Sequence, residues 1–254
     1  MFGLTGARVV VTGAGGGIGR VLCAALAREG ARVVGCDLAE AVVPTDCAEQ
    51  LGFDLSDAAA VTRAAARILA PGPPDVVIAN AGATRAETLA QTVPDDLTAE
   101  MAGNFDGPAR LSAALLPAMR GAGGNRSFVF VGSVNAQAHF GNPVYAAAKA
   151  ATLAWMRAIA VEEGRHGIRA NAVIPGSVRT NAWTERLKSD PQILARMSRL
   201  YPLGRIVTPK EVADAVLFLA SPLASGITGA TLNVDAGLMA GNLPFLNAIT
   251  PETP

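Results

Sequence analysis

The chain has 254 residues, half of them apolar and 17% charged, which suffices for one large α/β domain with a substantial core, or at most two small domains. Its 21 Lys and Arg residues balance 21 Asp and Glu residues, and a zero formal charge argues against a nucleic-acid partner, because phosphate binding needs a basic surface. The three cysteines (Cys23, Cys36 and Cys47) are odd in number and lack metal-ligand spacing. We therefore expect reduced thiols and no metal site.

Strand-like and helix-like segments alternate along the whole chain. The apolar patterns predict strands at Arg8–Thr12, Arg32–Cys36, Leu51–Phe53, Asp75–Ala79, Ser127–Gly132, Arg169–Ile174 and Thr231–Val234. Helices are predicted near Arg20–Glu29, Ala58–Ala70, Pro94–Arg120, Pro143–Glu163, Glu185–Ser198 and Pro209–Ala220, with at most one or two helical turns in Leu38–Gln50. This alternation indicates an α/β fold, a doubly wound and mostly parallel sheet of about seven strands with helices on both faces.

No linker or repeat divides the chain, so residues 1–254 are expected to form a single domain. Residues 241–254 form a tail that we expect either to fray or to pack against a partner subunit. The first strand begins near Arg8, which leaves no room for a secretory leader. The apolar stretch Val216–Val234 is interrupted by proline and glycine, so we expect no membrane span and a cytoplasmic protein.

A glycine-rich turn, Thr12-Gly13-Ala14-Gly15-Gly16-Gly17-Ile18-Gly19, lies directly between the first predicted strand and the first predicted helix. Such a turn lets backbone N–H groups and a helix N-terminus point at one phosphate. Glycine is needed there because a side chain would block the close approach of a pyrophosphate. The turn therefore predicts a dinucleotide site, with three residues between Gly13 and Gly17 where the common fingerprint has fewer.

Asp37 ends the second predicted strand, 20 residues after Gly17. An acid at this place accepts hydrogen bonds from the adenosine ribose hydroxyls, whereas it would repel a 2′-phosphate. No Lys or Arg lies between Gly13 and Gly19 or between Asp37 and Gln50. NAD is therefore favoured over NADP, the alternative being that Asp37 only caps a helical turn.

Polar or turn-forming residues also follow the next two predicted strands. Asp54 and Leu55 follow the third strand, and Asn80-Ala81-Gly82 follow the fourth. The carboxyl ends of strands are where ligands bind in open α/β sheets, so these residues are expected to join the cofactor site. Each segment alone is also compatible with an ordinary turn.

Tyr145 and Lys149 are four residues apart on a helix that Asn142, as cap, and Pro143 can start. Side chains at this spacing share a face, so the phenol and the ammonium can converge. Moving the pKa of a tyrosine from about 10 to neutral requires roughly 4 kcal/mol, which a desolvated cation can supply. Ser133, at the end of the fifth strand, can hydrogen-bond the phenol and a substrate oxygen together.

Taken jointly, these motifs resemble those of the short-chain dehydrogenase/reductase family. The resemblance runs from about Leu4 to Gly237 and rests on Thr12-Gly-x-x-x-Gly17-Ile18-Gly19, Asn80-Ala-Gly82, Asn104, Ser133, Tyr145-Ala-Ala-Ala-Lys149 and Pro175-Gly176. It implies a Rossmann-like fold and a nicotinamide cofactor that carries a hydride.

The resemblance also implies roles for individual residues. Tyr145 is the general acid/base, Ser133 orients the carbonyl or alcohol, and Lys149 binds the nicotinamide ribose and lowers the pKa of Tyr145. Asn104 holds a water in a proton relay that reaches Lys149. The nicotinamide clamp is formed by Pro175, Gly176, Val178 and Thr180.

Two positions depart from the family pattern. Ala79 replaces the first Asn of the usual Asn-Asn-Ala-Gly, which removes a structural hydrogen bond but leaves cofactor contact. The spacing from Ser133 to Tyr145 is about one residue shorter than is common, which puts the shape of the substrate site in doubt. Neither departure touches the acid/base or the hydride position.

The regions expected to set substrate choice are polar, with one or two aromatics: Asn135, Gln137, His139, Phe140 and Asn142 near Ser133, and Trp183 and Arg186 within Asn181–Arg205. They fit a polyol, sugar or hydroxy acid, or else they simply face solvent. Arg186 is expected to pair with Glu185 or Asp190 on a solvated helix rather than with a substrate anion.

The expected function is NAD-dependent interconversion of a secondary alcohol and a carbonyl. The alternatives are reduction of a 3-oxoacyl thioester, for which Arg179, Arg186 and Lys188 leave room, and a catalytically silent NAD-binding sensor or structural subunit. The helix Pro143–Glu163 is apolar nearly all round, and the resemblance implies that it forms a subunit interface, so we expect a homo-oligomer, a tetramer or a dimer.

Overall fold

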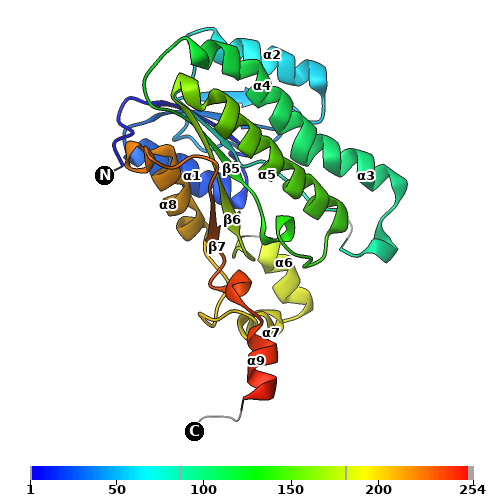
Figure 1. The fold of residues 1–254 in the computed structure, drawn as a ribbon. Helices are drawn as coiled ribbons and strands as arrows, with labels where there is room; N and C mark the ends of the chain where they lie inside the picture. Colours follow the sequence, from blue (N-terminus) through cyan, green and yellow to red (C-terminus); the bar gives the residue numbers. More distant parts are fainter. Residues whose placement is uncertain (1, 86, 181, 251–254) are drawn as a thin grey trace.

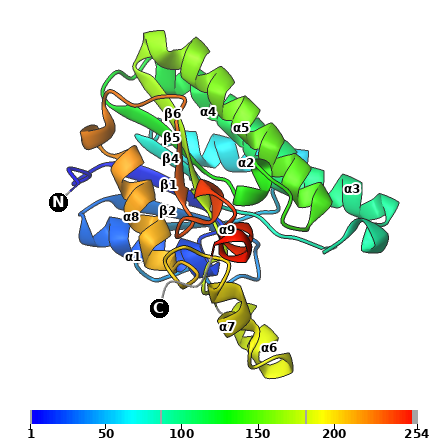
Figure 2. The same cartoon turned by 60° about the horizontal axis from the view of Figure 1, so that its bottom comes forward.

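The computed structural model describes residues 2–85, 87–180 and 182–250. Within them, seven parallel strands form one sheet in the order β3-β2-β1-β4-β5-β6-β7 (Figures 1 and 2). The strands are β1 (Arg8–Thr12), β2 (Arg32–Asp37), β3 (Glu49–Gly52), β4 (Val76–Ala79), β5 (Arg126–Val131), β6 (Ile168–Pro175) and β7 (Thr231–Val234). The doubly wound α/β prediction is confirmed, with β1 and β7 at their predicted bounds.

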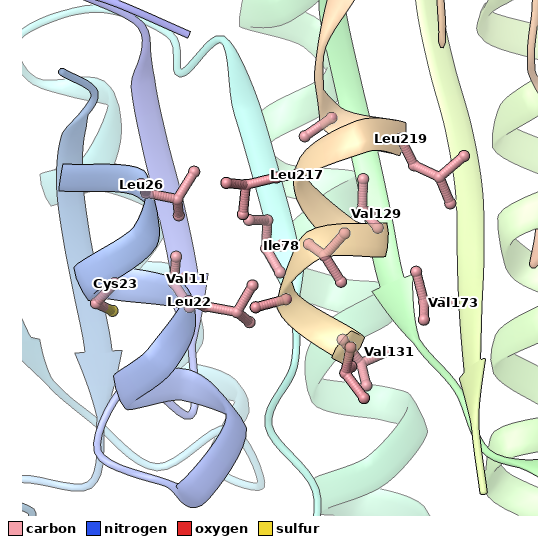
Figure 3. Packing of buried hydrophobic residues seen from close by; sticks show 14 of the residues in the cluster. Val11, Leu22, Cys23, Leu26, Ile78, Val129, Val131, Val173, Leu217 and Leu219 are labelled. Carbon is pink, nitrogen blue, oxygen red and sulfur yellow. The ribbon is translucent and has the colours of Figure 1, made fainter. Parts of the chain in front are cut away.

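Helices cover both faces of the sheet (Figures 1 and 2). One face carries α1 (Gly17–Arg28) and α8 (Pro209–Ala220), and the other carries α2 (Ala58–Leu69), α4 (Gly107–Arg120) and α5 (Pro143–Glu163). Successive strand residues point to opposite faces, so Val9 and Val11 join the α1 and α8 side while Val10 joins the other. Figure 3 shows the first of these cores, where Leu22 and Leu26 of α1 face Leu217 of α8 over Ile78.

The strand order reverses between β1 and β4, which are hydrogen-bonded neighbours. β2 and β3 lie on one side of this pair, and β5, β6 and β7 lie on the other. Connections run outward from this pair in both directions, so a crevice opens at the carboxyl ends of these two strands. The glycine turn and Asn80 lie at those ends.

Three predicted helices differ from the structure. The first begins at Gly17 rather than Arg20, because the glycine turn itself supplies the first helical turn. The predicted helix Pro94–Arg120 is α3 (Pro94–Met101) followed by a wider π-turn at Ala102–Asp106 and then α4. The predicted helix Glu185–Ser198 is two helices, α6 (Ala182–Ser189) and α7 (Ile193–Ser198), separated at Pro191, which cannot continue a helix.

The segment 38–48 contains turns and no helical turn in the structure. The tail is more ordered than expected: α9 (Leu243–Ile249) extends away from the sheet (Figure 1), and residues 251–254 lie outside the described part of the chain. Among the described residues one helix, Pro143–His166, is long and apolar enough to cross a membrane, by length and composition only. This helix packs along β6, which accounts for much of its apolar composition.

Candidate active site

The main cavity opens at the carboxyl ends of β1 and β4 and has a volume of about 740 Å³. Of the predicted site residues it is lined by Gly13, Gly17, Ile18, Asp37, Asp54, Leu55, Asn80, Ala81, Gly82, Asn104 and Thr180. Among the described residues, its lining does not include Gly19, Ser133, Tyr145, Lys149, Pro175, Gly176 or Val178. The cavity therefore gathers most of the predicted nucleotide contacts, while the predicted chemical groups stand beside it.

The glycine turn is closed by a hydrogen bond from Gly16 N to Gly13 O of 3.1 Å, and α1 follows at once. Gly13 has φ +67°, and a Cβ on it would meet the Ala81 backbone at 2.8 Å. A Cβ on Gly19 would lie 1.9 Å from Gly13 O. The residue before α1, Gly16, has no side chain to cap it and the first turn has no acidic residue, so the positive helix end stays available to an anion.

Thr12 and Asn80 tie the ends of β1 and β4 together. The Thr12 hydroxyl accepts from the backbone N–H groups of Asn80 and Ala81, each at 3.1 Å. The Asn80 amide donates to the carbonyls of Thr12 at 3.0 Å and Gly13 at 3.1 Å. Asn80 thus fixes the shape of the glycine turn as well as lining the cavity. The role of Thr12 in joining the two strand ends was not predictable from the motif, because it depends on β1 and β4 being neighbours.

Asp37 ends β2 beside the glycine turn. Its Oδ2 accepts from Gly15 N at 2.7 Å and its Oδ1 from Leu38 N at 2.8 Å. Arg20, the residue that follows Gly19, donates to Gly15 O at 2.8 Å and to Val42 O at 2.7 Å. The carboxylate therefore lines the cavity at the end of β2, and the nearby guanidinium is already bound to two carbonyls.

Asn104 lies in the π-turn between α3 and α4 and is 3% exposed. Its amide donates to Ala83 O and to Glu100 O, both at 2.9 Å, and its Oδ1 accepts from Ala83 N at 3.1 Å. A Cβ on Gly82 would meet Asn104 Oδ1 at 2.9 Å and Lys149 Nζ at 3.2 Å. Asn104, Gly82 and Lys149 are therefore brought together, as the family resemblance implied.

Tyr145 and Lys149 lie on one face of α5, with Lys149 Nζ 5.4 Å from the centre of the Tyr145 ring. The buried Nζ donates to Val131 O at 2.9 Å, and desolvation lowers the pKa of Lys149 to about 8. Asn142 is the N-cap residue of α5, as predicted, with left-handed backbone and no capping hydrogen bond from its side chain.

Burial raises the pKa of Tyr145 to about 12. A hydrogen bond with Ser133 acts in the opposite direction and lowers this pKa, while the charge of Glu100 raises it further. Ser133 therefore acts on the Tyr145 phenol across the shortened loop. The lowering of this pKa by Lys149 stays a prediction.

Among the described residues that follow β6, Thr180 is the one that lines the cavity. Thr180 N donates to Val178 O at 2.8 Å, and Val178 pairs with Val207 in an isolated bridge. The Thr180 side chain packs against Gly17, because a Cβ added to Gly17 would lie only 2.7 Å from it. Gly176 N donates to Val234 O, which holds the segment to the end of β7.

The residues expected to choose the substrate are only partly where the pattern indicated. Trp183 is 8% exposed and packs into the α1 and α8 core. Arg186 pairs with Glu87 at 2.7 Å, which corrects the predicted partner Asp190, because Asp190 pairs with Arg196. Asn181 and the side chain of Glu185 lie outside the described part.

The loop after Ser133 makes contacts of its own. Asn135 Nδ2 donates to Gly141 O at 2.7 Å, and Gln137 exchanges hydrogen bonds with Asn233. His139 and Phe140 are exposed. Of the predicted residues in this loop, Asn135 therefore bonds within the loop, Gln137 bonds to β7, and His139 and Phe140 face solvent.

Comparison with known proteins agrees with this geometry. The family described as Enoyl-(Acyl carrier protein) reductase matches residues 13–239. The chain is 41% identical to an uncharacterised oxidoreductase of Schizosaccharomyces pombe, over 96% of this chain and 95% of that one. It is 39% identical to galactitol 2-dehydrogenase (L-tagatose-forming) of Cereibacter sphaeroides, over 93% and 96%, and 35% identical to (3R)-3-hydroxyacyl-CoA dehydrogenase of Canis lupus familiaris, over 92% and 97%.

Solved structures give the same answer. An oxidoreductase of the short-chain dehydrogenase/reductase family from Burkholderia thailandensis superposes with a TM-score of 0.87 at 37% identity, covering 98% of this chain and 99% of that one. A gluconate 5-dehydrogenase from Burkholderia cenocepacia, in complex with NADP and tartrate, superposes with a TM-score of 0.85 at 29% identity, over 94% and 98%. The parallel sheet, the glycine turn and the relatives together place this chain in the short-chain dehydrogenase/reductase family, as an oxidoreductase that acts on CH–OH groups.

Proposed function

We propose that this protein is an NAD-dependent enzyme that interconverts a secondary alcohol and its carbonyl compound, on a small hydroxylated substrate. The observation that carries the proposal is the placement of buried Lys149 and Tyr145 on one face of α5, with Lys149 Nζ 5.4 Å from the centre of the Tyr145 ring. Ser133 acts on the same phenol, where it lowers the pKa. A carbonyl–alcohol conversion needs one group that holds the substrate oxygen and a second group that transfers the proton of that oxygen.

The residues around the cavity fit a dinucleotide. The uncapped start of α1 suits a pyrophosphate, and Asp37 stands where the adenosine ribose hydroxyls would donate. Asp54, Leu55, Asn80, Ala81 and Gly82 would line the remainder, with Thr180 opposite Gly17. A bound NAD would supply the hydride acceptor for alcohol oxidation, and NADH the hydride donor for carbonyl reduction.

The chain's own residues handle the proton. Ser133 Oγ holds the substrate oxygen, and Tyr145 Oη takes the alcohol proton during oxidation and returns it during reduction. The Lys149 ammonium stabilises the phenolate, and Asn104 holds a water that links Lys149 to solvent. Pro175, Gly176 and Val178 are proposed to position the nicotinamide from the end of β6.

The cofactor is proposed to be NAD because Asp37 places a negative charge where NADP carries its 2′-phosphate. The gluconate 5-dehydrogenase neighbour binds NADP, so the two cofactors are compared directly in the assay. A polyol, sugar or hydroxy acid is the proposed substrate class, supported by the galactitol dehydrogenase relative.

The test is reduction of NAD⁺ and of NADP⁺ over a panel of polyols, sugars, hydroxy acids and secondary alcohols. Wild type is expected to reduce NAD⁺, and Tyr145→Phe to lose at least about a hundredfold in kcat, because the proton acceptor is gone. Binding of NADH, followed by its fluorescence, should survive in Tyr145→Phe. Normal turnover by that variant would contradict the acid/base role.

A second candidate is a 3-oxoacyl-thioester reductase, which the hydroxyacyl-CoA dehydrogenase relative favours. Acetoacetyl-CoA with NADH separates it from the first, since a polyol enzyme would leave this substrate unchanged. A silent NAD-binding subunit is disfavoured because Ser133, Tyr145, Lys149 and Asn104 are all present.

We further propose a single domain over residues 1–254 and a homo-oligomer, a tetramer or a dimer, built on α5. Val161, an apolar residue near the end of this helix, is 82% exposed, which supports a face that a partner subunit covers. A native mass spectrum that shows only the monomer would contradict the proposed homo-oligomer. A cytoplasmic location is supported by the three free cysteines of the described chain.

A further inference from the structure

Tyr201 is one of the two tyrosines of the chain, and none of the steps above uses it. It lies in the loop between α7 and α8 and is 1% exposed, with its ring in the core on the α1 and α8 side of the sheet. Burying a tyrosine hydroxyl is costly unless the hydroxyl finds a hydrogen-bond partner. The partner of this hydroxyl therefore indicates what the side chain holds in place.

The Tyr201 hydroxyl is bonded to the segment that follows β6. Its oxygen accepts from the backbone N–H of Ser177 at 3.1 Å. Ser177 stands between Gly176 and Val178, two residues that are proposed to position the nicotinamide. The Tyr201 ring also packs on Gly176, because a Cβ added to Gly176 would lie 3.2 Å from Tyr201 Cε1. One side chain therefore holds this segment by a hydrogen bond and by packing.

Backbone hydrogen bonds tie the same segment to the stretch before α8. Ser177 O accepts from Val207 N at 3.1 Å, and Val207 O accepts from Arg179 N at 2.8 Å, on either side of the bridge between Val178 and Val207. Thr180 then packs against the glycine turn and lines the cavity. Because Thr180 follows Ser177 so closely along the chain, a displacement of Ser177 reaches the cavity wall.

We propose that Tyr201 is a positioning residue for the nicotinamide half of the cofactor: its hydroxyl fixes the backbone at Ser177 and so holds the segment from Gly176 to Thr180 against the cavity. This inference rests on the proposed function, because it takes a nicotinamide dinucleotide as the ligand. A segment that is held in place before the cofactor arrives loses less conformational entropy on binding. Asp37 is proposed to hold the adenosine ribose from the end of β2, so Tyr201 should affect one half of the dinucleotide and leave the other half alone.

The test uses Tyr201→Phe, which removes the hydroxyl and keeps the ring that packs on Gly176. Because the segment loses one hydrogen bond, NADH is expected to bind about three- to tenfold more weakly than to wild type. 5′-AMP carries the adenosine and one phosphate but no nicotinamide, so it should bind wild type and Tyr201→Phe equally well. Isothermal titration calorimetry measures both affinities.

Thr228→Val is the matched control. The Thr228 hydroxyl also accepts from a backbone N–H at 3.1 Å, that of Ala170, but near the amino end of β6. Removing this bond should lower the temperature of unfolding and leave the affinities for NADH and 5′-AMP unchanged. A hydroxyl with a merely structural role would give this result, whereas the ratio of the two affinities should change in Tyr201→Phe alone.

The hydrogen bond itself can be measured without a ligand. In Tyr201→Phe the Ser177 N–H should exchange with solvent about tenfold faster or more, because its acceptor is gone. The N–H groups of Arg179 and Val207 should stay protected, since their backbone bonds remain. Hydrogen exchange followed by NMR measures all three amides.

In a protein that reduces NAD⁺, equal weakening of NADH and 5′-AMP by Tyr201→Phe, or no weakening of either, overturns the inference. Unchanged exchange of the Ser177 N–H in that variant also overturns it. A wild-type protein that binds neither NADH nor NADPH contradicts the proposed function instead. In that case the exchange of the Ser177 N–H still decides whether the Tyr201 hydroxyl holds the segment.

Discussion

The ammonium of Lys149 lies 5.4 Å from the centre of the Tyr145 ring, at the buried end of a hydrogen bond to Val131 O. The two side chains respond to this burial in opposite ways. Desolvation lowers the pKa of Lys149 to about 8 and raises that of Tyr145 to about 12. Burial therefore destabilises the charged form of both side chains, the ammonium of Lys149 and the phenolate of Tyr145.

This relationship predicts how stability depends on pH. The folded pKa of Lys149 is depressed, so between about pH 8 and 10.5 the unfolded chain binds more protons and the free energy of unfolding rises with pH. Relative to Lys149→Met, wild type should gain about 2 to 3 kcal/mol between pH 7 and pH 10. Urea unfolding at both pH values measures this difference.

The matched control is Lys210→Met, because the Lys210 side chain is 73% exposed. Its difference from wild type should not vary over the same range. Tyr145 has the opposite sign, since its raised pKa lets stability fall above about pH 10, which is the upper limit of the measured range. A pH-independent gap between wild type and Lys149→Met would contradict the burial argument.

Gly19 gives a second prediction, on the glycine turn. A Cβ there would lie 1.9 Å from Gly13 O, so Gly19→Ala must push α1 away from the turn. We expect a loss of about 1 to 3 kcal/mol in unfolding free energy and at least tenfold weaker NADH binding. Thermal unfolding and fluorescence titration measure the two effects. Gly226→Ala is the control, because nothing lies within 4 Å of a Cβ at that position.

Asp37 gives a third prediction, on cofactor choice. Asp37→Asn keeps an acceptor for only one of the Gly15 and Leu38 N–H groups, and it removes the charge that would face a 2′-phosphate. The ratio of kcat/KM for NADP⁺ to that for NAD⁺ should rise about tenfold or more. Glu40→Gln, an exposed acid three residues further on, should leave the ratio unchanged. An unchanged ratio in Asp37→Asn would contradict the proposal that the charge of Asp37 selects NAD over NADP.

Sequence patterns located most of the fold because they depend on local periodicity. α5 and α8 have the predicted bounds, Pro143–Glu163 and Pro209–Ala220, since proline starts each and a long apolar pattern sustains it. The break at Ala102–Asp106 was not predictable in this way. It depends on Asn104 bonding to Ala83, and on Gly107 passing so close to Leu55 O that a Cβ would be 2.2 Å away.

The residues of the candidate site show the same distinction between local patterns and contacts that form only on folding. Asp37 and the Tyr145–Lys149 pair were visible because spacing on a strand or a helix places them. The burial of Glu100 was not predictable in this way, because it depends on the cavity and on the bond to Arg85 N, which exist only in the folded chain. Arg186 was assigned a partner on its own helix, whereas the structure pairs it with Glu87, 99 positions away.

The pairing of α4 with α5 gives a fourth prediction. Arg120 holds Glu163 through two hydrogen bonds, of 2.6 and 2.5 Å, and Glu163 is 5% exposed. Arg120→Met leaves this carboxylate nearly buried without its partner, so Tm at pH 7 should fall by about 3 to 6 °C. Thermal unfolding followed by circular dichroism measures the change.

The pH dependence of this loss has a definite sign. The bond to Arg120 lowers the pKa of Glu163 below its usual 4.5, so the contribution of the pair is present above that value and disappears as pH falls through the lowered pKa. Wild type and Arg120→Met should therefore converge in strongly acidic solution. Asp214→Asn breaks an exposed ion pair with Lys210 and should change Tm little at any pH, because surface pairs are screened. A gap between wild type and Arg120→Met that persists in acid would mean that Arg120 acts through packing rather than through its charge.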